Sequence, residues 1–378
     1  MSLQIHLPAS TPADLTLQLR FDEPAGSEHT SIRATHLPAE WFPQSGVQLT
    51  WPHDGTDWAP VLRDVTRCYM RMALEIAERE RLIIVTSEPQ LLRRQLEEKL
   101  PQAALRNISL HQAEADDTWA RDHGFLTLLA DDGPHLLDFQ FNGWGQKFCA
   151  EKDNRINACL WQQGIFCGTY ENHLDFVLEG GSIESDGRGT LLTTTRCLTA
   201  PHRNQPLSQA DIELRLKAFF HAERVLWLDY GYLAGDDTDS HIDTLARFCP
   251  ADTIAYVQCT DPSDEHYVEL QQMEAQLRTF RTPDDKPYTL LPLPMAEPAY
   301  DADGQRLPAT YANFLVINGA VLMPTYGHPD TDALAREQLQ RAFPRHEVVG
   351  IDCQTLILQH GSLHCSAMQF PAGTLRTS

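Results

Sequence analysis

Apolar residues return at helical spacing in four segments of the chain, residues 61–79, 88–100, 208–220 and 331–343. A spacing of three and four residues places such positions on one face of a helix, so each segment is predicted to be an amphipathic helix. Ser87 stands where the cap of the second helix is expected. Ser208 and Asp211 have the spacing of a capping box at the start of the third.

Between these helices lie apolar runs that come in pairs, separated by tight-turn residues. The pairs are 125–130 with 136–141, 182–184 with 190–195, and 314–317 with 320–323. The residues between the runs include Asp-Gly or Asn-Gly, which supply the backbone conformations that short hairpin turns require. Weaker versions of the pattern start at His241 and Leu363. The sequence therefore predicts five β-hairpins.

The hairpins recur every 50 to 70 residues or so, with a helix between several of them, which indicates repeated strand-strand-helix-strand units. We expect an α/β propeller in which such units surround a common axis. A doubly wound sheet would need strands that alternate singly with helices, so the paired strands argue against it. The proline-rich segment 282–308 is interpreted as a long surface loop or an arm over the site.

Charge limits the range of partners. The 378 residues include 52 acidic and 30 basic side chains, for a formal net charge of -22. Nucleic acid is held chiefly by clustered Lys and Arg, so this balance argues against a nucleic-acid partner. A small cationic ligand would suit the field, although an acidic surface also simply keeps a protein soluble.

The chain carries no evident targeting or membrane segment. Its first 20 residues lack a basic region followed by an apolar core, and no apolar run approaches the roughly 20 residues that cross a bilayer. We therefore expect a cytoplasmic protein without a membrane partner. Its nine cysteines are scattered and odd in number, which indicates mostly reduced core residues. Cys365 must therefore be judged by its surroundings.

Candidate catalytic and binding residues lie at or near the starts of the predicted hairpins. Trp119 and Asp122 precede the first, Glu179 precedes the second, His241 and Asp243 precede the third, and Cys365 lies in the last. If the units are related by rotation, these positions face one axial cavity. The set suits the hydrolysis of a guanidinium, because carboxylates can hold the planar cation, a thiolate can attack its carbon, and a histidine can move protons.

The expected reaction follows from this set. The thiolate of Cys365 attacks the central carbon, and ammonia leaves with a proton from His241. A covalent S-alkylthiouronium remains. His241 then takes a proton from water, and the hydroxide releases a ureido product. A thiol suits this role because it ionises far more readily than a serine hydroxyl.

Several stretches resemble agmatine deiminases and the bacterial, Porphyromonas-type peptidylarginine deiminases. They are Leu37-Pro-Ala-Glu-Trp41, Trp119-Ala-Arg-Asp122-His-Gly124, Asn142-Gly-Trp144-Gly145, Glu179-Gly-Gly-Ser-Ile183, Arg203-Asn204, Asp237-Thr-Asp-Ser-His241-Ile-Asp243, Ala246-Arg247-Phe248 and Leu363-His-Cys365. The resemblance extends from about residue 35 to 372. Residues 1–34 have no recognised counterpart, so we expect an N-terminal extension of unknown role before a single catalytic domain, residues 35–378.

The resemblance implies the five-bladed α/β propeller (pentein) fold of the guanidino-group-modifying enzymes, no metal or other cofactor, and pairing into a homodimer. It also implies roles for the residues at the hairpin starts. Asp122 and Asp243 would grip the guanidinium, Glu179 would partner His241 and take part in binding, and Trp119 would line the pocket.

The substrate stays open at this point. The loop before the cysteine, residues 359–364, is less glycine-rich than in agmatine deiminases, and Ser240 replaces a common glycine. Such changes reshape a pocket without removing a catalytic group. Agmatine hydrolysis to N-carbamoylputrescine is the first hypothesis. Hydrolysis of peptidyl-arginine or another alkylguanidine, amidino transfer to an amine, and an inactive homologue that only binds a cationic ligand are the others.

A metal site is the chemical rival, because His360, His364 and Cys365 lie close together in sequence. Neighbours on a strand point to opposite faces, so His364 and Cys365 would not share an ion, and we expect no metal and a structural role for His364. The acidic pairs 116–117 and 236–237 are interpreted as solvated loops or caps. Asp237 could also support His241.

Overall fold

The structure is a computed structural model that describes residues 35–376. The expected N-terminal extension, residues 1–34, lies outside the described residues. Within them, five sheets share one pattern, in which a central strand pairs antiparallel with one neighbour and parallel with the other. The antiparallel pairs confirm the predicted hairpins of the first four units.

The strands of these sheets, in spatial order, are as follows. The first sheet has β1 (Thr35–His36), β5 (Leu126–Ala130), β6 (Gly133–Gln140) and β7 (Thr169–Val177). The second has β8 (Ile183–Ser185), β9 (Thr190–Thr194) and β10 (Arg224–Leu228). The third has β11 (Ala246–Cys249), β12 (Thr253–Gln258) and β13 (Thr289–Pro294), and the fourth has β16 (Leu315–Ile317), β17 (Ala320–Thr325) and β18 (Glu347–Asp352).

The fifth sheet joins the two ends of the described chain. Its order is β19 (Ala367–Pro371), β2 (Gln44–Thr50), β3 (Arg81–Thr86) and β4 (Ile108–Gln112). The hairpin predicted at Leu363 is therefore wrong in its partner, because β19 pairs antiparallel with β2 and not with a following strand. The apolar pattern of a strand records which face is buried but not which distant strand lies beside it.

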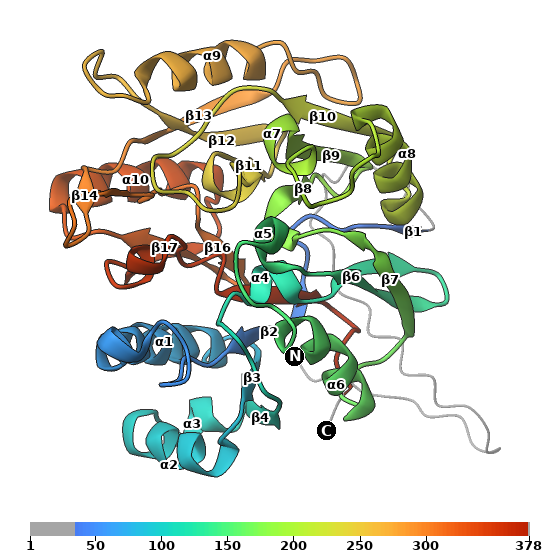
Figure 1. The fold of residues 1–378 in the computed structure, drawn as a ribbon, viewed down its shortest axis with the longest axis vertical. Helices are drawn as coiled ribbons and strands as arrows, with labels where there is room; N and C mark the ends of the chain where they lie inside the picture. The colour runs from blue at the N-terminus through green and yellow to red at the C-terminus, as the bar shows by residue number, and fades with distance from the viewer. Residues whose placement is uncertain (1–34, 377–378) are drawn as a thin grey trace, which may run out of the picture. The chain divides into compact units, whose positions relative to one another are not determined.

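A helix connects the central strand of each of these five sheets to its parallel neighbour. These helices are α1 (Leu62–Ala77), α6 (Ile156–Gln162), α8 (Gln209–Phe220), α9 (Tyr267–Leu277) and α10 (Pro329–Ala342). Figure 1 shows α1, α8, α9 and α10 at the outer side of their sheets, with the short helix α4 (Ala120–His123) between the sheets. The predicted strand-strand-helix-strand unit is thus present, and the fold is α/β.

The amphipathic pattern explains how each helix packs. In α1 the residues Val65, Tyr69, Met72 and Ile76 follow the helical spacing, and all four are buried. They join the apolar cluster that contains the strand residue Leu49. Burial of this stripe drives the helix onto the sheet, while its polar face stays in solvent.

Of the two predicted helix N-caps, the structure confirms one and contradicts the other. Ser208 and Asp211 form the predicted capping box, with each side chain accepting a hydrogen bond from the other residue's backbone N–H. Ser87 is not the cap of α2 (Pro89–Lys99), because the helix begins at Pro89 and its N-cap is Glu88. Proline suits this first helical position, since its fixed φ fits a helix and its missing N–H would have no partner there. The connecting helices α6, with 7 residues, and α9, with 11, were not predicted.

The proline-rich segment 282–308 is not the predicted long loop or arm. It contains β13, which pairs in parallel with β12 along its whole length, and a small antiparallel pair, β14 (Ala299–Tyr300) with β15 (Arg306–Leu307). Pro292 and Pro294 are tolerated because β13 is an edge strand. A backbone N–H on the open side of an edge strand has no partner strand, so its absence in proline costs no sheet hydrogen bond. None of these residues is among the described residues that line the pocket of Cys365.

In residues 35–376, no helix combines the length and the apolar character needed to cross a bilayer.

Candidate active site

Cys365 opens into a pocket of about 600 Å³ that several loops build together. Aromatic and acidic side chains dominate its wall. The lining residues are Asp57, Asp117, Trp119, Asp122, Trp144, Phe148, Asp237, Thr238, Gln359, His360, Gly361 and Cys365. The predicted residues Trp119, Asp122 and Cys365 therefore share one cavity.

The thiol of Cys365 is held by an amide and a carboxylate. Its Sγ lies 3.2 Å from Nδ2 of Asn313 and 3.6 Å from Oδ2 of Asp243. Oδ1 of Asn313 accepts hydrogen bonds from the backbone N–H groups of His364, at 2.9 Å, and Cys365, at 3.3 Å. Asn313 thus fixes both the side chain and the backbone of the candidate nucleophile.

Cys365 and His364 were predicted to lie on a strand, but they do not. They occupy a turn before β19, which begins at Ala367. The alternation argument against a shared ion therefore does not apply to them. The thiol and the imidazole instead contact one oxygen, Oδ2 of Asp243, which lies 3.6 Å from Sγ of Cys365 and 2.8 Å from Nδ1 of His364. The other ring nitrogen of His364, Nε2, lies 2.6 Å from Oε1 of Glu40.

The surroundings of Cys365 disfavour a thiolate while the pocket holds no cation. The pKa of its thiol is raised well above the usual value, first by burial and then by the negative charges of Asp243 and Asp122. A thiolate needs positive charge nearby to form readily. The geometry therefore suits a nucleophile that ionises only when a cation enters.

Asp243 has one oxygen engaged and one oxygen available. Its Oδ2 lies 2.8 Å from Nδ1 of His364, and its Oδ1 has no hydrogen-bond partner among the described residues. Burial favours the neutral acid, but the hydrogen bond and charge of His364, with His241 and Arg247 nearby, outweigh burial and lower the pKa of Asp243. An ionised carboxylate with a free oxygen can accept N–H groups from a guanidinium.

Asp122 is held rigidly by two donors. The backbone N–H of Gly181 donates to its Oδ1 at 3.0 Å, and Nε1–H of Trp144 donates to its Oδ2 at 2.9 Å. Burial raises the pKa of this carboxyl to about 6, with His241 acting against the shift and Asp243 adding to it. Asp122 is therefore ionised at neutral pH but close to its titration range.

His241 is completely buried, and neither ring nitrogen has a hydrogen-bond partner among the described residues. Its Nδ1 lies 3.7 Å from Oδ1 of Asp122. Burial alone would lower the pKa of the imidazole, but the charges of Asp122, Cys197 and Glu179 outweigh it and raise the pKa to about 10. His241 is therefore protonated at neutral pH and can give a proton to a leaving amine.

Glu179 reaches the site through an ion pair that is wholly buried. Nε of Arg203 donates to its Oε1 at 3.0 Å, and neither side chain is exposed. The second carboxylate oxygen of Glu179 has no partner among the described residues. The carboxylate thus keeps one free oxygen near His241.

Gly181 shows how closely the predicted groups converge. A β-carbon at this position would lie 2.7 Å from Nδ1 of His241, 2.8 Å from Oδ1 of Asp122 and 3.1 Å from Oδ2 of Asp243. Three groups from two separate parts of the chain therefore surround one point, and only glycine leaves them room. The Glu-Gly-Gly motif is explained by this contact.

Trp119 forms one wall of the pocket. Its Nε1–H donates to Oδ2 of Asp117 at 2.9 Å, and its ring lies so close to Gly361 that a β-carbon there would be 2.3 Å from the ring. Asp117 also accepts from Nε1–H of Trp58 at 2.9 Å, so it is not the solvated loop residue that was predicted. The two acidic residues alone do not indicate that one of their carboxylates binds two indole N–H groups.

The acidic pair 236–237 divides in the structure. Asp236 is a cap, as predicted, because its carboxylate accepts from the backbone N–H groups of Thr238 and Ser240. Asp237 lines the pocket and lies 3.9 Å from Nδ1 of His360. The closest ionic partner of His241 is Asp122, and no described contact joins His241 to Asp237, whose support of His241 stays a prediction.

Two groups of described residues bring metal-type ligands together, and neither is the group suggested by the sequence. The ligand atoms of Glu179, Cys197 and His241 lie within 4.8 Å of one another, as do those of Glu40, Glu184 and His364. In the second group Arg247 already supplies the positive charge, since its guanidinium contacts Glu40, Glu184 and His364. His360 lies elsewhere, with Nδ1 bonded to the backbone oxygen of Gly235.

Asn313 is the residue at the thiol that the sequence analysis missed. It directly precedes the hairpin of β16 and β17, in the position where the other units carry Asp122, Glu179 or His241. The rule that identified those residues would have found it. It was not predicted because a neutral amide has none of the three roles expected in the site, which are to hold a cation, to attack a carbon and to move a proton.

Comparison with known proteins agrees with this geometry. The chain matches the profile of the Porphyromonas-type peptidyl-arginine deiminase family over residues 36–371. An agmatine deiminase of Pseudomonas aeruginosa (strain LESB58) is 31% identical over 361 residues, covering 89% of this chain and 95% of that protein. These matches span nearly the whole described chain.

Solved structures show the same likeness. A Porphyromonas gingivalis protein, provisionally named an arginine deiminase, has a TM-score of 0.85 and 52% identity, covering 90% of this chain and all of that one. The C. jejuni agmatine deiminase, solved with substrate bound, has a TM-score of 0.82 and 34% identity, covering 90% of this chain and 97% of that one.

The fold and site define an agmatine deiminase-like hydrolase that acts on C–N bonds of amidines. Within that class, the chain belongs to the Porphyromonas-type peptidyl-arginine deiminase family.

Proposed function

We propose that this chain hydrolyses agmatine to N-carbamoylputrescine and ammonia through a covalent S-alkylthiouronium intermediate on Cys365. One observation carries the proposal. The thiol lies 3.6 Å from Asp243, in the same pocket as Asp122, and both carboxylates are buried. Such a pocket favours a planar cation placed against the sulfur.

The substrate supplies the charge that the site lacks. A guanidinium between Asp122 and Asp243 would use the free oxygen of Asp243 and neutralise the two charges that raise the pKa of the thiol. The thiol of Cys365 then loses its proton to solvent, because His241 is already protonated, and the thiolate attacks the guanidinium carbon to give a tetrahedral centre.

His241 would serve first as an acid and then as a base. Protonated at neutral pH, it gives its proton to the departing ammonia as the thiouronium forms. The neutral imidazole then takes a proton from water, and the hydroxide attacks the thiouronium carbon to release the ureido product. Glu179, anchored by Arg203, favours the protonated form of His241.

The pocket mouth supports a second positive charge on the substrate. Asp57, Asp117 and Asp237 line it, and no Lys or Arg is among the described lining residues. The distal ammonium of agmatine fits these carboxylates, whereas the carboxylate of free arginine would meet like charges. Peptidyl-arginine, with no charge at that place, is the second candidate because the matching family carries that name.

A substrate panel tests the proposal. Agmatine, free arginine, a blocked arginine amide and a butylguanidine would be compared by ureido product, with Cys365→Ala as control. The proposal expects agmatine to have the highest kcat/KM and the Cys365→Ala variant to be inactive. Preferred turnover of the blocked arginine amide would reassign the substrate.

The mouth residues offer a sharper comparison. Replacing Asp57 and Asp237 together by Asn should raise KM for agmatine about tenfold, as expected when a charge pair is lost, and leave KM for butylguanidine nearly unchanged. Equal changes for both compounds would mean that the mouth does not recognise the distal ammonium.

Two further outcomes separate the remaining hypotheses. An inactive homologue would bind agmatine in calorimetry and yield no ureido product on long incubation. An amidinotransferase would give a new alkylguanidine when excess amine is present. The proposal expects neither, since all groups needed for hydrolysis lie in the site.

We also propose that the five sheets are the blades of a five-bladed propeller with the site on its axis. In support, each blade contributes at the start of its hairpin or first strand: Asp122, Glu179, His241 with Asp243, Asn313, and Cys365. Residues 35–378 would form the catalytic domain, so deletion of 1–34 should leave kcat unchanged. A homodimer and a cytoplasmic location stay predictions, the first to be checked by light scattering.

A further inference from the structure

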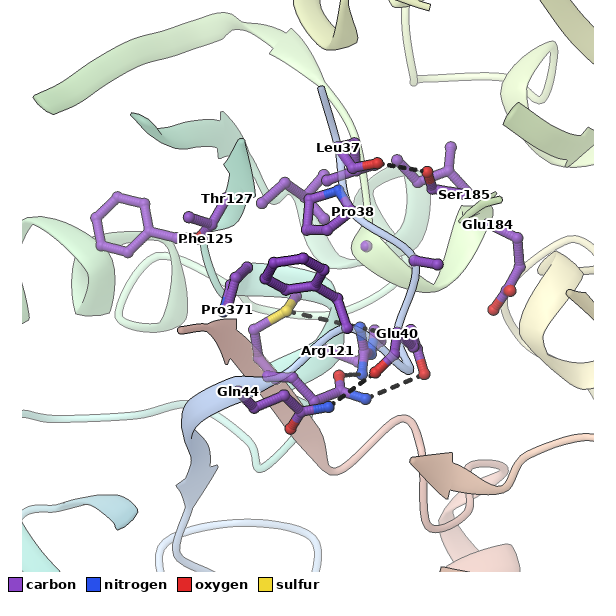
Figure 2. A pocket seen from close by; sticks show the side chains of 17 residues that line it. Leu37, Pro38, Glu40, Gln44, Arg121, Phe125, Thr127, Glu184, Ser185 and Pro371 are labelled. Atoms are coloured by element: carbon purple, nitrogen blue, oxygen red, sulfur yellow. Dashed lines mark hydrogen bonds and ion pairs between the residues drawn. The ribbon is translucent and has the colours of Figure 1, made fainter. Parts of the chain in front are cut away.

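A second pocket, of about 570 Å³, shares no lining residue with the pocket of Cys365. Figure 2 shows Glu40 and Arg121 side by side within it, with Leu37, Pro38 and Phe125 among the apolar residues around them. The reaction proposed above uses none of these residues. The pocket nevertheless reaches the catalytic groups through Glu40.

Glu40 makes charged contacts with three residues. Its Oε1 lies 2.6 Å from Nε2 of His364 and 3.3 Å from a guanidinium nitrogen of Arg121, and its Oε2 accepts from Arg247 at 2.6 Å. The two arginines and His364 lower its pKa well below the usual range, against burial, which alone would raise it. Glu40 is therefore a fixed negative charge.

His364 transmits this contact to the active site. Its other ring nitrogen, Nδ1, lies 2.8 Å from Oδ2 of Asp243, and that oxygen lies 3.6 Å from Sγ of Cys365. The side chains of His364 and Asp243 are each 1% exposed, whereas that of Glu40 is 20% exposed. Three successive contacts thus lead from the second pocket to the thiol.

We propose that Glu40 and His364 are positioning residues for the hydrolysis, with Glu40 holding His364 and His364 holding the carboxylate of Asp243. This inference rests on the proposed function. The ring of His364 faces a carboxylate at each nitrogen, and turning it would break both contacts, so it fixes the carboxylate of Asp243. Burial lowers the pKa of His364, and a neutral imidazole has one N–H, so it donates to one of the two carboxylates at a time. Because His364 holds Oδ2 of Asp243, the other oxygen, Oδ1, has a fixed position and remains free to accept a hydrogen bond from a guanidinium.

Glu184 offers a matched control. Its side chain is 3% exposed, against 20% for Glu40, and it binds the same guanidinium of Arg247. Its carboxylate lies within 4.8 Å of the ring of His364 but makes no described hydrogen bond or ion pair with it. A purely structural role for the network predicts that Glu40→Gln and Glu184→Gln have similar effects. The positioning role predicts that only the first variant changes catalysis.

The experiment compares kcat and KM for agmatine in Glu40→Gln, Glu184→Gln, His364→Gln and the double variant Glu40→Gln/His364→Gln. Glu40→Gln should lower kcat/KM roughly ten- to hundredfold, the range expected when a hydrogen bond to a charged group no longer supports the transition state, with a rise in KM. Glu184→Gln should stay within about threefold of wild type in both constants. Unfolding by urea reports the stability of every variant.

The double variant decides whether the two residues act in series. If Glu40 acts through His364, Glu40→Gln/His364→Gln should be no slower than His364→Gln alone, since the same interaction is lost. Additive losses, or equal losses in the Glu40 and Glu184 variants with KM unchanged, would overturn the inference. A wild-type protein that turns over no guanidine at all would instead overturn the proposed function.

Discussion

The Sγ atom of Cys365 lies 3.6 Å from Oδ2 of Asp243. A thiol and a carboxylate at this distance oppose each other's ionisation, and Asp243 is the one that stays charged, because His364 lowers its pKa while burial raises that of the thiol. Reactivity is thus withheld until a cation enters. A site arranged in this way protects its nucleophile from adventitious electrophiles.

This arrangement predicts a slow reaction of the free enzyme with iodoacetamide at Cys365. At pH 8 we expect alkylation there to be at least about tenfold slower than at the exposed Cys149, because only the thiolate reacts. Asp243→Asn removes a neighbouring negative charge and should accelerate alkylation at Cys365. Mass spectrometry of the separated peptides measures both rates in one sample.

Burial alone would also slow alkylation, so the carboxylate effect needs a control. Asp57→Asn removes a charge from the mouth of the same pocket without touching the thiol. It should leave the rate at Cys365 nearly unchanged. Fast alkylation of wild-type Cys365 at pH 7, or equal acceleration by both substitutions, would refute the account.

The titration of Asp122 should set the acidic limb of the pH dependence of kcat/KM. Because its pKa is raised to about 6, the carboxyl is protonated below that pH and ionised above it. Only the ionised form can hold a guanidinium, so kcat/KM should fall as pH drops through about 6. His241 has a pKa near 10 and stays protonated across this range, so it does not contribute to this limb.

A pH series of kcat/KM for agmatine, with stability checked at each pH, measures this limb. The Asp122→Asn substitution should lower kcat/KM for agmatine by roughly 10² to 10⁴-fold or more at every pH, as for other residues that contact the reacting group. An acidic limb centred near pH 4 would show that Asp122 is not the titrating group.

The hairpins and several candidate site residues could be predicted from the sequence, because both are marked by short local patterns. Tight turns at Asp186-Gly187 and Asn318-Gly319 marked hairpins that the structure contains. The starts of the hairpins marked Asp122 and His241, which the structure brings to 3.7 Å of each other. Repetition along the chain was the signal that linked residues so far apart.

What the sequence could not supply was pairing between distant segments. Nothing near β19 indicates that it joins β2, and nothing near Glu40 indicates a contact with His364. Asp117 illustrates the same limit, since its role depends on two indoles that reach it from outside its own loop. Such contacts are set by how the sheets pack, which a local pattern does not encode.

Gly181→Ala should abolish activity with little effect on folding. Its β-carbon would lie 2.7 Å from Nδ1 of His241 and 2.8 Å from Oδ1 of Asp122, which displaces both groups from the substrate. We expect kcat/KM to fall at least about a hundredfold, as for small misplacements of catalytic groups. Gly55→Ala, at an exposed loop, is the control and should be fully active. A variant at Gly181 with wild-type kcat would show that the groups are not confined as described.

The buried pair of Arg203 and Glu179 gives a prediction about stability. Neither side chain is exposed, so Arg203→Met leaves a carboxylate buried with its main partner gone, which costs about 3 to 5 kcal/mol of unfolding free energy. Adding Glu179→Gln removes that charge and should restore part of the loss, although the enzyme stays inactive. By contrast, Arg278→Met breaks an exposed pair with Glu274 and should cost about 1 kcal/mol or less. Urea unfolding with linear extrapolation measures all three. If Arg203→Met costs no more than Arg278→Met, Glu179 is not held as an ion inside the protein, and its assistance to His241 fails with it.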